Sequence, residues 1–178
     1  MKNIILLLFL ICSSVSAQDK FITKTGSINF EASVPSFEEV AAKNNSVTAI
    51  INTENGEIAA LALVKGFRFK NALMEEHFNE NYAESDTFPK ATFKGKIEDF
   101  DIEKTKATYI LNGELSFHGK TKTINNISIP VSVIGNKIML QGNFSTKASD
   151  FDIDIPKIVS NKITEDINIS FKFELLKK

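Results

Sequence analysis

Apolar and polar side chains alternate with a period of two along most of this chain, which is the pattern of half-buried β-strands. The alternation is clearest at 107–118, and it returns at 123–134, 137–146 and 163–175. The whole chain is expected to hold about eight strands, which are mostly antiparallel because their connections are short. No alternation of strands with helices is present, so the fold class is all-β.

A sheet with this number of strands can form a sandwich or a closed barrel, and the pattern is compatible with both. We favour an antiparallel β-barrel with one or two short helices. A barrel of this size closes around an interior that either fills with side chains or holds one small ligand.

The N-terminal part of the pattern predicts a hairpin and a helical turn. Segments 19–24 and 27–33 read as two strands around a Thr25-Gly26 turn. Ser36 followed by Glu39 has the spacing of a capping box, which predicts a short helical turn there.

Three positions in the strand pattern predict local irregularities. The apolar phase slips within 57–70, which predicts a β-bulge at Gly66. His118-Gly119 predicts a tight turn between two strands. Pro130 lacks an amide donor, so its strand should meet an edge, a bulge or a weakly paired neighbour at that point.

One helical segment interrupts the strands. Its apolar positions have the spacing of one helix face: Leu73, Met74, His77 and Phe78. Pro89 pushes Phe88 towards an extended conformation, so the helix should end before Phe88 and a strand should follow at 91–97. We expect the apolar face of this helix to close one end of the barrel.

The first residues have the features of a secretory signal peptide. Lys2 precedes an apolar run at 4–11, and small residues before Gln18 predict cleavage near Ala17. This divides the chain into a signal peptide, 1–17, and one domain, 18–178. The apolar run is too short to span a bilayer, so no stable transmembrane anchoring is expected and the location is periplasmic or secreted. Cys12 suggests a lipoprotein, but Ile11 is not the small residue expected before a lipidated cysteine.

Composition excludes several classes of function. The net charge is −1 without long blocks of one sign, so the chain lacks the basic surface expected of a nucleic-acid-binding protein. Cys12 is the only cysteine, so the domain after cleavage has no disulfide and no thiol chemistry. The chain has 15 Phe and no Trp, and Phe supplies apolar area without a polar group.

No set of residues forms a catalytic constellation, and we expect no enzyme activity and no cofactor. His77 and Glu80 could form part of a metal site, but the sequence lacks the further ligands and HExxH spacing that such a site needs. His118 is interpreted as a turn residue. The aspartates at 150–154 lack the calcium-loop pattern and are interpreted as solvated charges.

The Phe-rich interior leaves two alternatives open. The Phe side chains could fill the core of a ligand-free structural or interaction module, or they could line a cavity. The alternation alone does not decide between them.

Three stretches resemble the YceI family of secreted bacterial lipid-binding proteins. They read MEEHFNENY at 74–82, SDTFPKATF at 85–93 and GELSFHGKTK at 113–122. The resemblance implies a lipocalin-like barrel with a helical segment near one mouth. It also implies an apolar tunnel for a polyisoprenoid or another long lipid. The sequence is compatible with a homodimer and does not decide it.

The resemblance and the alternation together assign a set of apolar residues to the ligand. These are Phe30, Phe67, Phe69, Met74, Phe78, Phe93, Leu111, Leu115, Phe117, Ile129, Phe144, Ile169, Phe171 and Phe173. The expected function is therefore to sequester or carry a hydrophobic lipid, with an isoprenoid as the expected ligand.

Overall fold

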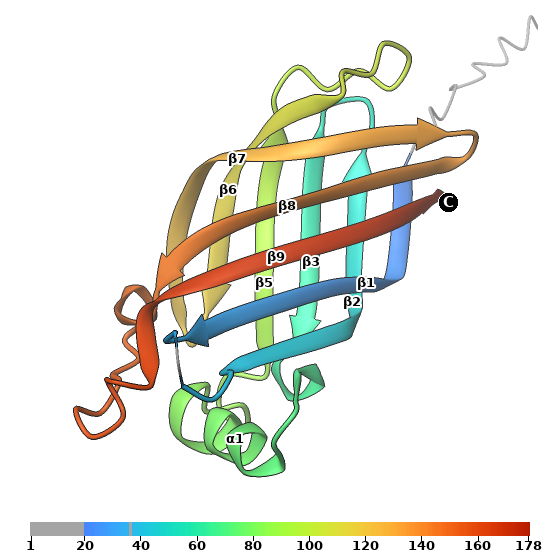
Figure 1. Ribbon diagram of the computed structural model, residues 1–178. Coiled ribbons are helices and arrows are strands. Elements are labelled where there is room, and N and C mark those ends of the chain that lie inside the picture. The colour runs from blue at the N-terminus through green and yellow to red at the C-terminus, as the bar shows by residue number, and fades with distance from the viewer. Residues whose placement is uncertain (1–19, 36) are drawn as a thin grey trace, which may run out of the picture.

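The computed structural model describes residues 20–35 and 37–178. In this part of the chain, nine strands form one antiparallel sheet in the order β1-β9-β8-β7-β6-β5-β3-β2-β4, and an additional β1–β2 pairing closes it (Figure 1). The predicted antiparallel barrel with about eight strands and a short helix is confirmed, because β4 is only a two-residue strand beside β2. None of the described helices is long and apolar enough to cross a bilayer.

The elements follow one another as strands interrupted by short helical turns. The strands are β1 (Lys20–Ser33), β2 (Ala41–Asn52), β3 (Glu57–Leu63), β4 (Arg68–Phe69), β5 (Lys90–Ile97), β6 (Thr108–Phe117), β7 (Lys120–Ile134), β8 (Lys137–Lys147) and β9 (Ile163–Lys177). The helical elements are the 3-10 turn η1 (Val64–Gly66), helix α1 (Ala72–His77), the π-helical turn η2 (Phe78–Tyr82) and the 3-10 turn η3 (Ala148–Phe151).

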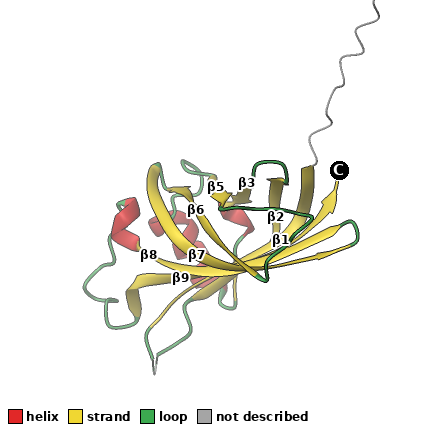
Figure 2. Cartoon of the chain, turned by 90° about the horizontal axis from the view of Figure 1, so that it is seen from above, coloured by secondary structure: helices red, strands yellow, loops and turns green. Residues whose placement is uncertain are grey.

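The helical turns lie at one end of the barrel and the C-terminus lies at the other, as Figures 1 and 2 show. The amide of Lys178 donates to the carbonyl oxygen of Lys20, which joins the C-terminus to the start of β1 at that end. We call the end that carries α1 the mouth.

The first predicted hairpin is wrong. β1 runs without a turn through Thr25-Gly26, and its register against β2 shifts on both sides of Gly26. A side chain at Gly26 would place its Cβ 2.6 Å from the ring of Phe173. The glycine therefore makes room for an aromatic ring inside the barrel, and the irregularity is absorbed as a bulge.

The predicted helical turn after β1 is also wrong in the described residues. Ser36 lies outside them, and residues 37–40 form no helix. The side chain of Asn44 is buried within β2, where its Nδ2 donates to the carbonyl oxygen of Leu63 at 3.0 Å. This hydrogen bond favours the extended conformation that continues β2 through the asparagine.

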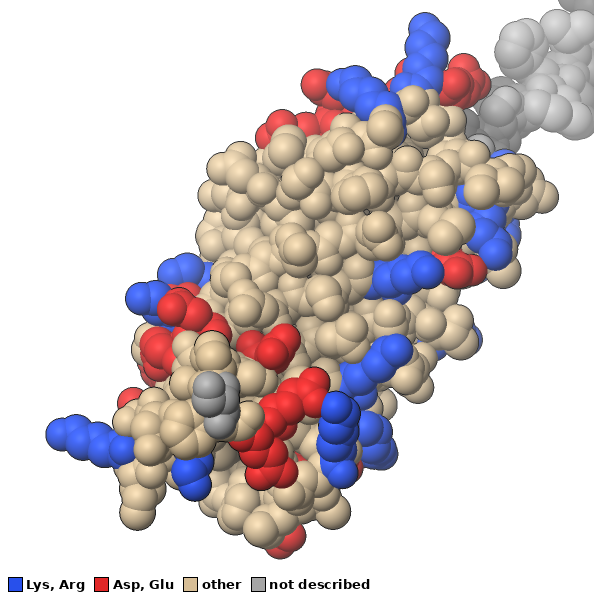
Figure 3. All heavy atoms as spheres, in the orientation of Figure 1, with Lys and Arg blue, Asp and Glu red and all other residues tan. Residues whose placement is uncertain are grey.

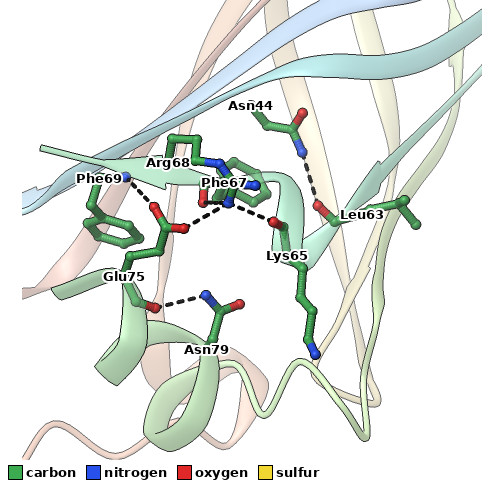
Figure 4. Close-up of polar contacts among 8 residues, drawn as sticks. All are labelled: Asn44, Leu63, Lys65, Phe67, Arg68, Phe69, Glu75 and Asn79. Atoms are coloured by element: carbon green, nitrogen blue, oxygen red, sulfur yellow. Dashed lines mark hydrogen bonds and ion pairs between the residues drawn. The ribbon is translucent and has the colours of Figure 1, made fainter. Parts of the chain in front are cut away.

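The phase slip at Gly66 has a different cause from the predicted bulge. The 3-10 turn η1 separates β3 from β4, and a Cβ at Gly66 would meet Nδ2 of Asn44 at 2.6 Å. Figure 4 shows the asparagine side chain bound to Leu63 just before this turn. Position 66 therefore requires glycine, because the buried Asn44 side chain leaves no room for a Cβ there.

The two other predicted irregularities are confirmed. His118 and Gly119 both have positive φ, as a two-residue turn between β6 and β7 requires. β7 pairs with β6 as far as Pro130, whereas its pairing with β8 begins only at Val131. The proline therefore lies where one edge of β7 has no strand partner.

Candidate functional site

The barrel contains a cavity of about 430 Å³ that extends to the mouth. This volume lies within the range of roughly 300–1,000 Å³ that is usual for small-molecule sites. Three segments surround it at the mouth: the β1–β2 loop (described residues 34–35 and 37–40), α1 with η2, and the β8–β9 loop (residues 152–162). The interior is therefore not completely filled by its Phe side chains.

Small side chains on two neighbouring strands leave room for the cavity. Ala60 and Ala62 of β3 face inward, and Ala91 of β5 lies opposite Ala62 in the ladder. Two facing alanines leave space that larger side chains would occupy. The alanine-rich strand β3 therefore leaves free space on its side of the cavity, whereas the rest of the wall is largely aromatic.

Four phenylalanines form a cluster at the mouth. Phe30 of β1 lies with its ring centroid 5.3 Å from that of Phe67, 5.7 Å from Phe69 and 5.2 Å from Phe78. Phe78 also packs on Phe69 at 5.2 Å. Since Phe78 comes from η2, this cluster attaches the helical segment to the barrel wall.

Polar contacts fix the position of α1 beside this cluster (Figure 4). Oε1 of Glu75 accepts from Arg68 at 2.8 Å, and its Oε2 accepts from the amide of Phe69 at 3.1 Å. Nδ2 of Asn79 donates to the carbonyl oxygen of Glu75 at 2.8 Å. One carboxylate thereby joins the helix to the edge of β4.

The cavity is closed at the end opposite the mouth. Four fully buried side chains near the strand ends pack there: Ile51, Ile97, Ile138 and Leu175. Ile138 lies opposite Leu175 in the β8–β9 ladder. A bound molecule would therefore enter and leave at the mouth or through the wall.

The structure brings nearly all the residues assigned from the sequence to this one cavity. Its lining includes Phe30, Phe67, Phe69, Met74, Phe78, Phe93, Leu111, Leu115, Phe117, Phe144, Ile169, Phe171 and Phe173. Ile129 does not line it. That side chain is fully buried, and its Cγ2 atom lies 2.9 Å from where a Cβ of Gly142 would be.

The helix face expected to cover the barrel is only partly correct. Met74, His77 and Phe78 line the cavity, but Leu73 is 57% exposed. Leu73 follows the N-cap residue Asn71, whose side chain accepts from the Leu73 amide. It therefore lies in the first turn of α1, outside the apolar face that Met74 and Phe78 form.

The sequence interpretation missed the contribution of the chain after β8. Phe151, Ile153, Ile155 and Val159 all line the cavity. The sequence signal for these residues was the alternation of isoleucines with the aspartates at 152–154. That stretch was interpreted only for its charged side chains. The apolar members of that alternation face the cavity.

The 3-10 turn η3 completes the wall of the cavity where β7 and β8 do not pair with each other. β7 and β8 pair only from Val131 and Leu140 to the hairpin turn, so both strands continue towards the mouth without pairing to each other. Phe151 of η3 is buried and packs on Phe117 at 5.8 Å. Its carbonyl oxygen accepts from Nδ1 of His118 at 2.8 Å.

Two ion pairs hold this segment against β7. Lys122 contacts Asp150 at 2.7 Å, and Lys120 contacts Asp152 at 2.5 Å. Asp150 also accepts from the Lys147 amide and the Thr146 hydroxyl. The hydrogen bond from Lys122, followed by the one from the Lys147 amide, lowers the pKa of the Asp150 carboxyl.

The cavity has few polar groups, and its ionisable side chains come from the ends of the segments at the mouth: Glu38, His77, Tyr82, Lys147 and Lys162. Nδ1 of His77 accepts a hydrogen bond from Nδ2 of Asn81 at 3.1 Å. No cluster of three or more His, Cys, Asp or Glu suited to a metal ion occurs among the described residues. The arrangement can hold an apolar molecule with a polar group at the mouth.

Comparisons with known proteins point to one fold. The first solved structure is a polyisoprenoid-binding domain from Saccharophagus degradans, with a TM-score of 0.76 and 15% identity, covering 90% of this chain and 99% of that one. BcnA of Burkholderia cenocepacia gives a TM-score of 0.70 and 16% identity, covering 85% and 96%. The YceI protein of Campylobacter jejuni gives a TM-score of 0.66 and 18% identity, covering 82% of this chain and 89% of that one.

The TM-scores show a shared fold, and at these low identities they show the fold alone. A search of the curated proteins gave no match. The family model described as the YceI-like domain matches residues 18–175, which is nearly the whole chain. The protein therefore belongs to the YceI-like domain family.

Proposed function

We propose that this protein is a periplasmic or secreted carrier that holds a long apolar lipid, a polyisoprenoid, in the barrel cavity. The observation that carries the proposal is the apolar cavity with one closed end and a mouth where the ionisable groups lie. A lipid chain would occupy the interior, and its polar end would remain at the mouth.

The physical basis of binding would be removal of apolar surface from water. Each square ångström of apolar surface buried contributes about 25 cal/mol, so a long hydrocarbon chain gains affinity with every methylene it places inside. The barrel wall offers no charged group to a buried chain, because the ionisable lining residues belong to the mouth. Which lipid binds would therefore depend on the width and length of its hydrocarbon chain.

Two further observations support the proposal. The Saccharophagus degradans protein with the same fold is a polyisoprenoid-binding domain. The predicted signal peptide at 1–17 supports export from the cytoplasm.

Filling the cavity tests the proposal. Ala91→Phe places a ring among the lining residues, whereas Ala59→Phe adds the same ring to the outer face of β3. Protein loaded from detergent with prenols of increasing length would be weighed by native mass spectrometry. Ala91→Phe should bind the longest retained prenol at least about tenfold more weakly, because it displaces several methylenes worth about 0.8 kcal/mol each.

The control separates the cavity from general damage. Ala59→Phe should load like the wild type, and both variants should keep the circular dichroism spectrum of the barrel. Equal loading of wild type and both variants would contradict a ligand in this cavity.

A further inference from the structure

We propose that the mouth of the barrel docks on the surface of an anionic lipid bilayer, with the β8–β9 loop as its leading contact. The inference rests on the proposed lipid-carrying function. It adds the surface from which the ligand would be collected or to which it would be delivered.

Exposed apolar side chains surround the mouth. Phe37 is 47% exposed, Leu73 57% and Ile158 85%. One belongs to the β1–β2 loop, one to α1 and one to the β8–β9 loop, so each of the three segments at the mouth presents a large apolar group to solvent. Exposed apolar groups collected at one place mark an interaction site more often than scattered ones do.

The apolar surface continues from the loop tip into the cavity. Ile158 lies at the exposed tip, and its neighbours Ile155 and Val159 line the cavity. With Ile158 inserted among acyl chains, a lipid could pass from the bilayer to the interior along apolar side chains. A soluble protein partner would not require this continuity, so it favours a bilayer as the occupant.

Charge favours an anionic surface at the same loop. Lys157 and Lys162 belong to the same loop as Ile158 and form no ion pair with another described residue. They outnumber Asp154, the one carboxylate of this loop that also has no ion pair with a described residue. Figure 3 shows basic side chains projecting from this end of the molecule, with acidic ones nearby. Free ammonium groups beside an apolar tip combine the two attractions that hold peripheral segments at membranes.

The acidic groups of the mouth determine which part of it approaches first. Glu75 pairs with Arg68, and Glu39 pairs with Lys70, so these charges are compensated locally. Glu76 and Glu80 on the helical segment have no ion-pair partner among the described residues. An anionic bilayer would therefore meet the β8–β9 loop before α1.

The chain offers a matched pair of isoleucines for the test. Ile158 lies at the mouth, and Ile134, which is 67% exposed, is the last residue of β7 at the opposite end. The experiment measures co-sedimentation with vesicles of phosphatidylcholine alone or mixed with phosphatidylglycerol. It uses the chain from Gln18, which carries the whole described barrel and lacks the apolar signal segment.

The expected result is binding to the mixed vesicles that weakens with added salt. Ile158→Ser should weaken it about tenfold, because inserting an isoleucine side chain contributes at least the free energy of a tenfold change. Ile134→Ser should bind like the wild type. Lys157→Gln should reduce binding to the mixed vesicles and leave binding to pure phosphatidylcholine unchanged.

Two outcomes would overturn the docking proposal: no vesicle binding by the wild type, or equal losses in the two isoleucine variants. Loading of prenol from detergent separates this failure from failure of the carrier function. Prenol uptake from detergent without vesicle binding would refute docking alone, whereas no uptake from detergent would refute the carrier function itself.

Discussion

The ring of Phe78 lies 5.2 Å from the ring of Phe30, with their planes tilted by 36°. Phe78 belongs to the π-helical turn η2 and Phe30 to strand β1, so this contact joins segments far apart in the chain. It places the helical segment over the cavity at the mouth. The helical segment is therefore held at the mouth by this aromatic packing together with the Glu75 contacts.

Replacing Phe78 by alanine should destabilise the protein by about 2 kcal/mol, since the change removes a half-buried ring with three aromatic neighbours. Urea unfolding followed by circular dichroism measures the change. Leu73→Ala on the same helix is the control, because Leu73 is exposed and should change stability by less than about 0.5 kcal/mol. Similar losses in the two variants would show that the cluster does not hold the helix.

Two glycines facing each other determine where Phe93 lies. Gly95 of β5 pairs with Gly113 of β6, and a Cβ at Gly113 would meet the Phe93 ring and the Lys94 carbonyl oxygen, both at 2.5 Å. Gly113→Ala should therefore cost about 2 kcal/mol or more, because backbone or ring must move. Thermal unfolding measures the loss.

Gly135 provides the comparison for that substitution. Nothing lies within 4 Å of a Cβ there, so Gly135→Ala should lose only about 1 kcal/mol, from its positive φ. Prenol loading should fall in the Gly113 variant, since Phe93 is displaced within the cavity, and should remain normal in the Gly135 variant. The reverse order of losses would refute this role of the glycine pair.

Asp150 should stabilise η3 more than its neighbour Asp152 does. Asp150 is 21% exposed and accepts from Lys122, Lys147 and Thr146, whereas Asp152 is 65% exposed. Asp150→Asn should cost about 1 kcal/mol, and Asp152→Asn less than about 0.5 kcal/mol. Asn also tolerates the left-handed backbone at 152, which makes this control conservative.

The same carboxyl predicts a dependence on pH. Its pKa is lowered in the folded state by the Lys122 hydrogen bond, so its contribution is present above the ordinary aspartate pKa. The contribution is lost as pH falls through the lowered pKa. The stability difference between wild type and Asp150→Asn should therefore shrink towards zero on acidification, as urea titrations at several pH values would show. A difference that grows at low pH would contradict the assignment.

The alternation predicted the strands and which of their side chains face inward, because inward positions of a half-buried strand carry a period-two signal. It left a sandwich and a filled interior open, and only together with the family resemblance did it assign 14 residues to the ligand, all of which except Ile129 line the cavity. The alternation did not predict the backbone conformation at positions where one long-range contact determines it. Gly26 reads as a turn residue, but the Phe173 ring against it comes from the far end of the chain. Similarly, the Asn44 side chain that explains Gly66 is a long-range contact.

The missed part of the site has a related cause. The β8–β9 loop lacks regular strand structure, and its alternation of isoleucines with aspartates was interpreted only as solvated charges, although Ile155 and Val159 line the cavity. Ile129 was assigned to the lining because it shares the inward face of β7. Close packing at Gly142 fills the space that would have exposed it to the cavity. The alternation shows which face of a strand points into the barrel. Whether a side chain on that face reaches the cavity depends on the side chains that pack against it from across the barrel.

Whether the cavity carries a long apolar lipid is best measured by native mass spectrometry of the protein purified from its own host without detergent. We expect a bound mass that organic solvent releases as a polyisoprenoid. Ala91→Phe should lose most of this bound lipid, whereas Ala59→Phe should keep it. A wild-type protein that is lipid-free as isolated and takes up no prenol from detergent would contradict the carrier function.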